Sequence, residues 1–337
     1  MNPDGGPLPF TFLPGQFLVI KLTIGGTRVQ RSYTIASSPA RTDYCEITVK
    51  RAPEGVVSGY LNQQVREGEL LEVTGPAGRF TFTGAESESI VLIAAGVGIT
   101  PMMSVIRYLT DRAWPGDIYL IYACRGTSCL IFREELNYLK DRNPNLHVTL
   151  IFSREESPEW RGPRGHITKE LLAEAVPNLI SRRIHLCGPS GMMEAVKSSL
   201  AELGVSSVQI KTEAFTPERV VSVPPAGAVA ETILAATPGV GAPTPTAPTA
   251  TAVCIFENSG KRAPLPPDKS VLEASEDVDV NIDYSCRVGT CGVCKTRLLG
   301  GEITMAVEEA LEPEEKAEGW ILACQAKTRG GDVTVDA

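Results

Sequence analysis

The chain has 337 residues, more than a single hydrophobic core normally accommodates, so the length predicts two or three domains. A formal net charge of -8 does not favour nucleic-acid binding, and the longest apolar run, near residues 90–99, is far shorter than the about 20 residues that cross a bilayer. Nine cysteines, an odd number, and no apolar leader at the N-terminus indicate a reducing compartment, so we expect a soluble, cytoplasmic protein.

Residues 1–84 show short alternations of apolar and polar side chains that Gly and Pro interrupt. The strand signals fall at residues 17–22, 29–35, 45–50 and 70–75. Several short strands separated by turn residues predict a small antiparallel β-barrel.

Residues 85–218 alternate strand and helix patterns. Strand signals fall at residues 90–95, 117–123, 147–152, 182–187 and 208–212, and helical patterns at 101–112, 132–141, 168–175 and 189–204. This alternation predicts an α/β domain with an open parallel sheet of the nucleotide-binding kind.

The first of these strands runs directly into a glycine-rich turn, which a helix follows. The turn contains Gly96, Gly98, Thr100 and Pro101. Glycine lets the backbone approach a ligand, and the free N–H groups at a helix start favour a phosphate or pyrophosphate. The turn departs from the usual G-x-G-x-x-G spacing, so a tight turn needed only for packing is the alternative.

Residues 219–252 are rich in Pro, Ala, Thr and Gly and almost uncharged, which predicts an extended interdomain linker. Such a tether suits a domain that moves between two contacts, and equally a domain with one fixed docking position.

Residues 253–337 contain four cysteines in the spacing C-x4-C-x2-C followed by a distant fourth: Cys286, Cys291, Cys294 and Cys324. This spacing is typical of a plant-type 2Fe-2S cluster, and Gly289 and Gly292 allow a tight loop around it. A zinc site normally has two C-x2-C pairs, whereas this chain has one. The other cysteines, Cys45, Cys124, Cys129, Cys187 and Cys254, are expected to be small buried side chains.

The same region holds nine basic and 16 acidic residues and thus carries most of the net negative charge. Six of the acids lie close together: Glu308, Glu309, Glu312, Glu314, Glu315 and Glu318. They are candidates for steering a basic redox partner toward the cluster, or simply form a solvated helix face.

Several short motifs, taken in order, resemble the ferredoxin–NADP reductase superfamily over almost the entire chain. Arg31-Ser32-Tyr33-Thr34 and Gly55-Val56-Val57-Ser58 resemble its flavin signatures R-x-Y-[ST] and G-x-x-S. The turn at residues 96–101 resembles its nicotinamide-side turn, Cys187-Gly188-Pro189 its CGP motif, and Glu213-Ala214-Phe215 its closing E-x-F.

The resemblance assigns roles to these residues. Arg31 would pair with a phosphate, the Tyr33 ring would lie on the isoalloxazine, and Thr34 would reach a ring nitrogen. Thr34, Cys187 and Phe215 are the implied catalytic residues, with a core thiol and a packing aromatic as the alternatives for the last two. The further cofactor-binding candidates are Ser32, Val49, Lys50, Gly55, Val56, Val57, Ser58, Arg125, Ser153, Arg154, Gly188, Pro189 and Met192.

The resemblance implies a multidomain fold: an antiparallel β-barrel flavin domain, an α/β nucleotide domain and an α+β, β-grasp 2Fe-2S domain. Residues 55–58 and 75–80 look more like FAD-binding than FMN-binding members. Relatives carry another strand ahead of the segment that begins at Pro9, so the first barrel strand is expected to be absent or shortened here.

The implied function is an NAD(P)H-dependent reductase that passes electrons through FAD and the cluster to a separate acceptor, a Rieske-type or other oxygenase. A reductase of a hybrid-cluster protein, a redox sensor and a flavin oxidase are the alternatives. The donor stays open, because Ser153 and Arg154 suit the 2′-phosphate of NADPH, whereas Glu155 and Glu156 suit the ribose of NADH. The histidines, His147, His166 and His185, are expected to be structural.

Overall fold

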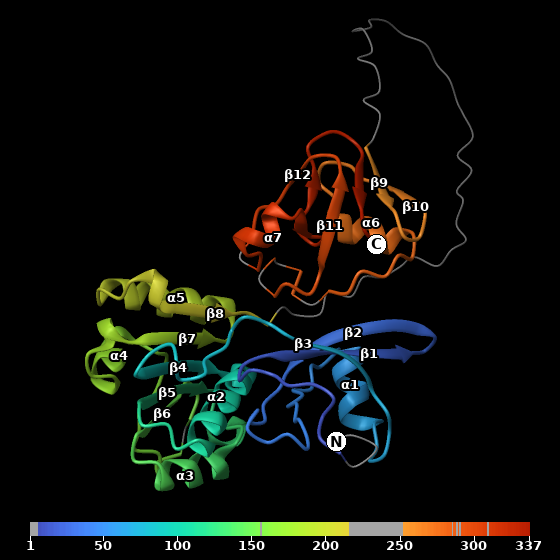
Figure 1. Ribbon diagram of the computed structural model, residues 1–337. Helices are drawn as coiled ribbons and strands as arrows, with labels where there is room; N and C mark the ends of the chain where they lie inside the picture. The colour runs from blue at the N-terminus through green and yellow to red at the C-terminus, as the bar shows by residue number, and fades with distance from the viewer. Residues whose placement is uncertain are drawn as a thin grey trace, which may run out of the picture.

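The computed structural model describes residues 6–155, 157–215, 252–284, 286–287, 289, 291–308 and 310–337. Nearly all of the predicted linker, together with Glu156 and Glu309, therefore lies outside the described residues. The described chain forms an N-terminal domain, a central α/β domain and a C-terminal domain (Figure 1). None of its described helices is both long enough and apolar enough to cross a membrane.

The N-terminal domain is built on an antiparallel sheet with the order β2-β1-β3 and on helix α1. Its elements are β1 (Phe17–Ile24), β2 (Thr27–Thr34), α1 (Val56–Gln63) and β3 (Glu72–Ala77). Gly25 and Gly26 join β1 to β2 with positive φ angles of 57° and 81°, the conformation that a two-residue hairpin turn requires. Between residues 6 and 16 the structure has no strand, and the Leu8 N–H donates to the Thr42 carbonyl at 2.7 Å.

The strand predicted over residues 45–50 is wrong as a regular element. Only one isolated bridge, between Ile35 and Ile47, marks it. The Ser37 hydroxyl accepts the Glu46 N–H at 3.0 Å, so a side chain takes the donor that a strand ladder would use.

The central domain is a five-stranded, wholly parallel sheet with the order β6-β5-β4-β7-β8. Its strands are β4 (Ser89–Ala95), β5 (Asp117–Cys124), β6 (Leu146–Phe152), β7 (Arg183–Cys187) and β8 (Ile210–Glu213). The strand order reverses beside β4, and ligands of such sheets bind at the carboxyl edge next to this reversal.

Helices cover both faces of this sheet. They are α2 (Ile99–Asp111), α3 (Arg133–Arg142), α4 (Lys169–Ala175) and α5 (Ser190–Glu202). Residues of α2 and α3 pack into one core, and residues of α4 and α5 pack into another on the opposite face. Cys129, expected to be buried, is exposed, because it lies in a short turn beyond the end of β5.

The C-terminal domain is a mixed five-stranded sheet of order β10-β9-β15-β11-β13 with helix α6 packed on its core. Its elements are β9 (Val253–Phe256), β10 (Lys261–Pro264), α6 (Val271–Asp277), β11 (Lys295–Gly300), β12 (Ile303–Thr304), α7 (Pro313–Ala317), β13 (Trp320–Leu322), β14 (Lys327–Thr328) and β15 (Val333–Val335). β15 and β9 are parallel and the other pairs antiparallel, which is the predicted β-grasp arrangement.

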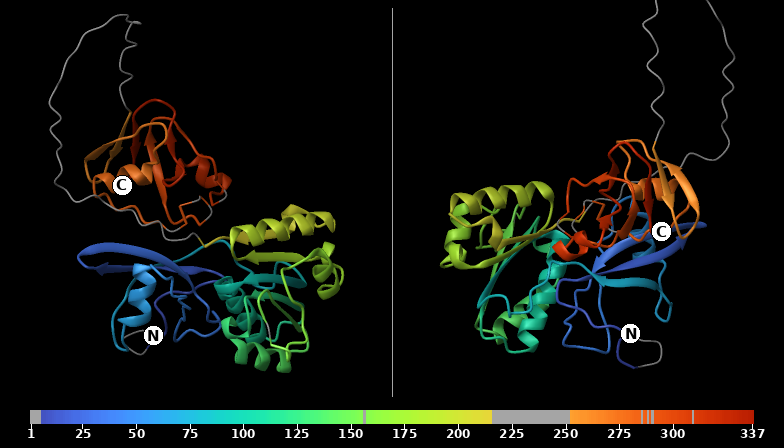
Figure 2. Two further views of the ribbon diagram at one scale, coloured as in Figure 1. Left: turned by 180° about the vertical axis from the view of Figure 1, so that it is seen from behind. Right: turned by 45° about the horizontal axis from the view of Figure 1, so that its top comes forward.

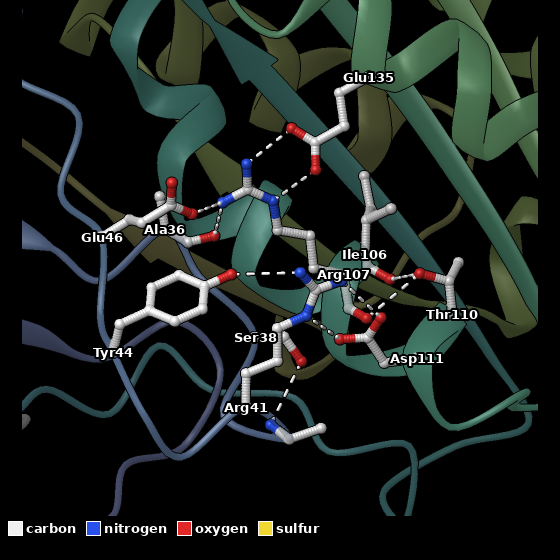
Figure 3. A network of polar contacts seen from close by, with 11 residues as sticks. Ala36, Ser38, Arg41, Tyr44, Glu46, Ile106, Arg107, Thr110, Asp111 and Glu135 are labelled. Carbon is white, nitrogen blue, oxygen red and sulfur yellow. Dashed lines mark hydrogen bonds and ion pairs between the residues drawn. The ribbon is translucent and has the colours of Figure 1, made fainter. Parts of the chain in front are cut away.

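The first two domains are joined tightly. Phe80 and Phe82 of the N-terminal part pack into the core beneath α2, and Ser104 donates to the Ser37 carbonyl at 2.9 Å. Figure 3 shows the polar contacts between residues 36–46 and α2. The C-terminal domain has its own core and lies over the β1–β3 sheet (Figure 2). The ion pairs Lys21–Asp283 and Arg79–Glu312 connect it to the N-terminal domain.

Candidate functional site

A cavity of about 990 Å³ opens where the three domains meet. This volume is at the upper end of the range for ligand sites, about 300–1,000 Å³. Its walls come from the ends of β2 and β8, the start of α1, the turn before α2, and the cysteine loop. The predicted residues that line it are Arg31, Ser32, Tyr33, Thr34, Lys50, Val57, Ser58, Thr100, Phe215, Cys286 and Cys291.

The lining is strongly basic. Arg79, from the FAD-type segment 75–80, and three cations outside the motifs, Arg51, Lys197 and Lys211, join Arg31 and Lys50 on the cavity wall. Glu213 is the one carboxylate among the described lining residues. A pocket with this balance of charge favours phosphate groups.

Thr34 ends β2 and is buried at the cavity wall, and its Oγ1 has no hydrogen-bond partner within the described protein. A buried hydroxyl without a partner costs free energy unless a ligand satisfies it. The position therefore fits a flavin whose ring edge presents a polar atom to Thr34. Antiparallel pairing with β1 fixes this end of β2, since Thr34 lies opposite Phe17.

The second flavin motif shapes the loop in front of α1. The Ser58 hydroxyl accepts the Ala52 N–H at 3.1 Å and donates to the Gly55 carbonyl at 3.3 Å. Ser58 thus holds the turn that presents Arg51 and Ala52 to the cavity. Val49, Gly55 and Val56 lie in the same region but do not line the cavity.

The glycine-rich turn lies at the carboxyl end of β4, where a dinucleotide would bind. Gly96 has a φ of 55° and open space where a side chain would be, as close approach of a ligand requires. A Cβ at Gly98 would lie 2.4 Å from the Cys187 carbonyl oxygen. The turn thus serves both interpretations, because Gly96 leaves room for a ligand and Gly98 permits packing. Pro101 is buried in the first turn of α2.

Cys187 ends β7 and its side chain is fully buried in the core beneath α2. Burial raises the pKa of its thiol well above the ordinary value, and the nearby Glu213 raises it further. The thiol does not line the cavity, whereas its carbonyl braces Gly98. Gly188 follows, and a Cβ there would lie 2.3 Å from the Met192 methyl. Pro189 is the residue that precedes α5.

Glu213 is a candidate residue that the sequence analysis quoted only as part of a motif. Its side chain is half-buried beside the cavity, and one buried carboxylate oxygen, Oε2, has no partner among the described atoms. Desolvation, with a smaller contribution from Cys286, raises its pKa to about 8. Two residues on, Phe215 lines the cavity and is 40 % exposed.

Arg125, Ser153 and Arg154 come together at the carboxyl edge of the sheet, outside the cavity lining. The Arg154 N–H donates to the Arg125 carbonyl at 2.7 Å. Next to them, the Glu155 carboxylate accepts the N–H groups of Thr127 at 2.6 Å and Ser157 at 3.0 Å, and these bonds lower its pKa. An ionised carboxylate therefore lies among the arginines at this edge.

The four predicted cluster ligands form two pairs. Hydrogen bonds link Cys291 to Cys286 and Cys294 to Cys324, and they raise the pKa of Cys291 and of Cys294. In the described part of the chain no three His, Cys, Asp or Glu side chains surround a single ion position. Two thiol pairs suit two irons with two protein ligands each, which is the donor set of a 2Fe-2S cluster rather than that of a mononuclear zinc ion.

Backbone geometry fits the same group. Gly289 and Gly292 have φ angles of 81° and 75°, and a Cβ at Gly289 would lie 2.8 Å from the Val307 carbonyl oxygen. The loop thus needs glycine at that point. Cys286 and Cys291 line the large cavity, so this edge of the loop faces Thr34 and Phe215 across the same space.

Comparisons with known proteins agree with this geometry. The model of the oxidoreductase FAD-binding domain matches residues 8–82, the oxidoreductase NAD-binding domain residues 92–198, and the 2Fe-2S iron-sulfur cluster binding domain residues 255–329. These matches confirm the three predicted cofactors, FAD, a nicotinamide dinucleotide and a 2Fe-2S cluster.

Full-length relatives share the arrangement. The chain is 35% identical to the glycine betaine monooxygenase reductase subunit of Chromohalobacter salexigens, over 94% of this chain and 85% of the relative. It is 32% identical to NADH oxidoreductase HCR of Escherichia coli, over 95% of this chain and 88% of the relative. The solved structure of phthalate dioxygenase reductase superposes with a TM-score of 0.58 at 25% identity, covering 100% of this chain and 91% of that one.

Fold and site together define a flavin- and dinucleotide-binding oxidoreductase with its own iron–sulfur domain. The chain belongs to the ferredoxin–NADP reductase superfamily, in the group whose members include reductase subunits of oxygenases.

Proposed function

We propose that this protein is the reductase component of an oxygenase system and supplies electrons from NADH to a separate terminal protein. The observation that carries the proposal is the shared cavity, in which the flavin-motif residue Thr34 and the cluster-loop residues Cys286 and Cys291 line one space. The names of relatives, such as the reductase subunit of glycine betaine monooxygenase, support an oxygenase as the acceptor.

A bound FAD would supply the chemistry that converts a hydride donor into one-electron transfers to the cluster, so the protein's own residues need no acid–base triad. Arg31, Lys50 and Arg51 hold phosphate groups, Tyr33 packs on the ring system, and the Thr34 hydroxyl binds a polar atom at the ring edge. Phe215, two residues beyond β8, would cover the face of the ring that the nicotinamide must approach.

On the dinucleotide side, the turn at residues 96–101 receives the pyrophosphate at the start of α2. The Cys187 carbonyl packs against Gly98 and so positions that turn. Through the turn, Cys187 also helps to position the nicotinamide. Gly188, Pro189 and Met192 line the neighbouring strand end, and Arg125, Ser153 and Arg154 bind the adenosine side. Desolvation raises the pKa of Glu213 to about 8 and so favours its neutral form, which would add no negative charge beside the flavin.

We propose NADH rather than NADPH as the donor. The Glu155 carboxylate, kept ionised by two backbone N–H groups, favours a ribose 2′-hydroxyl and repels a 2′-phosphate. The name of the Escherichia coli relative, NADH oxidoreductase HCR, supports the same choice.

The acceptor is proposed to present a basic surface to the C-terminal domain, because residues 253–337 carry 16 acidic side chains against nine basic ones. Opposite charges raise the rate of encounter between two proteins, and the effect falls with salt.

Anaerobic titration of the purified holoprotein with NADH, and separately with NADPH, tests the function. Bleaching of the flavin and cluster absorption bands by NADH is the expected result. Bleaching of the flavin alone would refute onward transfer, and absence of bound flavin would refute the proposal as a whole. Reduction without delivery to any one-electron acceptor would favour a redox sensor.

A further inference from the structure

A partly buried ion pair joins the C-terminal domain to the flavin domain. Lys21 Nζ lies 2.8 Å from Asp283 Oδ1, and the side chains are 10% and 28% exposed. Lys21 belongs to β1 and does not line the cavity. A lysine covered to this extent needs its partner, because an unpaired ammonium away from water is costly.

A second ion pair crosses the same interface. Arg79, after β3, pairs with Glu312, the residue that precedes α7. A Cβ at Gly292 would lie 3.4 Å from the Ala310 side chain, so the segment that leads to Glu312 lies beside the cysteine loop. Asp283 precedes Cys286 by three residues. Both acids therefore flank the loop that faces the cavity.

Two other acids of this region, Glu308 and Glu315, have their cations within their own domain. Lys316 pairs with Glu308 at 2.5 Å, and Lys295 pairs with Glu315 at 2.5 Å. Asp283 and Glu312, in contrast, receive their cations from the flavin domain. When the domains separate, these two carboxylates lose their counter-charges beside the cluster loop.

Resting on the proposed function, we propose that this face of the C-terminal domain serves two partners in turn. It docks on the flavin domain to receive an electron, and it then binds a basic face of the acceptor protein, whose cations take the places of Lys21 and Arg79. Electron transfer slows steeply with distance, so delivery requires the same edge of the loop that Cys286 and Cys291 present to the cavity. Docking on the flavin domain and binding of the acceptor therefore exclude each other.

The test uses the full-length holoprotein and the variants Lys21→Asp, Asp283→Lys, the double exchange of both, and Glu312→Lys. Small-angle X-ray scattering at low salt reports docking without reference to activity. Each single exchange is expected to increase the radius of gyration, and the double exchange to restore it. Lys169→Asp is the matched control, since Lys169 pairs with Glu202 at 2.9 Å within the central domain.

The second measurement uses cytochrome c, a basic one-electron acceptor, with the cluster reduced beforehand. Asp283→Lys and Glu312→Lys should raise the KM for cytochrome c about 3- to 10-fold, whereas Lys21→Asp should leave it unchanged or lower it. The double exchange should dock normally yet keep the high KM. This combination separates the two uses of one face, and the visible spectrum of each variant confirms that its cluster is assembled.

Two outcomes would overturn the inference. One is a radius of gyration that the double exchange does not restore. The other is a KM for cytochrome c that Lys21→Asp and Asp283→Lys raise equally. Failure of the proposed function is recognised separately, because wild-type protein would then not bleach its cluster band with NADH while the scattering results would still report docking.

Discussion

Arg107 and Glu135 form a two-pronged ion pair, with Nε 2.7 Å from Oε1 and Nη2 2.6 Å from Oε2 (Figure 3). The remaining nitrogen of Arg107 donates to the Ala36 carbonyl at 2.8 Å and to Glu46 at 3.0 Å. One guanidinium thus joins α2, α3 and the segment that follows the flavin motif of β2. Because the dinucleotide turn lies at the start of α2, this brace fixes that turn relative to the flavin side of the cavity.

Arg107→Ala is therefore expected to slow hydride transfer from NADH about 10- to 100-fold, since a misplacement of about 1 Å has effects of this size. Stopped-flow flavin reduction with 4-deuterated NADH measures it, and the isotope effect should increase. Arg112→Ala is the control, because Arg112 directly follows the same helix and its guanidinium lies 5.3 Å from the centre of the Tyr108 ring. An unchanged isotope effect in Arg107→Ala would contradict the positioning role.

Thr34→Val removes a buried hydroxyl that has no partner in the described protein. We expect FAD affinity to fall about fivefold, the equivalent of one hydrogen bond of about 1 kcal/mol, while the apoprotein keeps or gains thermal stability. Fluorescence titration with FAD and melting of the apoprotein measure the two effects. Thr23→Val, an exposed change on the neighbouring strand, should alter neither. Loss of stability in the apoprotein with unchanged FAD affinity would make Thr34 a structural residue.

Glu155→Gln removes the charge and leaves one acceptor oxygen, so it keeps a hydrogen bond from only one of the Thr127 and Ser157 N–H groups. We expect kcat/KM for NADPH to rise about tenfold and that for NADH to change little, because the repulsion of a 2′-phosphate is lost. Steady-state kinetics with both donors measure the ratio, with Glu159→Gln on the same loop as control. A preference for NADPH in the wild type would refute the choice of donor.

His185 is buried between Phe80 and Phe82, and desolvation lowers its pKa from 6.5 to about 3. Between these pH values the unfolded chain binds more protons than the folded one, so the free energy of unfolding falls as the pH falls below about 6.5. At pH 5 the loss is about 2 kcal/mol. Calorimetric melting should show a smaller drop from pH 7.5 to pH 5 in His185→Leu than in the wild type. Equal drops in both proteins would exclude His185 as the cause.

Local sequence patterns predicted the parallel sheet closely. The strand expected over residues 90–95 runs from Ser89 to Ala95, and the helix expected over 101–112 runs from Ile99 to Asp111. Continuous apolar runs and a glycine turn are signals that lie within a few neighbouring residues, so they can be recognised without knowledge of distant contacts. The cysteine spacing likewise predicted four residues that the fold brings together in pairs.

Features that depend on contacts between distant segments could not be predicted. Arg51 and Lys211 carry no motif, and only the packing of the first two domains against each other brings them to one cavity. The segment 45–50 alternates like a strand, yet the Ser37 side chain replaces its ladder bond. Cys187 occupies a motif position, but the depth of the core beneath α2, which no local pattern records, buries its thiol.

The packing of Phe80 and Phe82 beneath α2 has a consequence for how such a protein can be assembled from parts. These two side chains of the flavin half belong to the core of the dinucleotide half, so a recombination joint near residue 85 would split that core and destabilise the dinucleotide fragment. The C-terminal domain encloses a separate interior and touches the rest through charged side chains. Exchange of that domain between reductases thus changes the destination of the electrons and leaves the machinery that collects them intact.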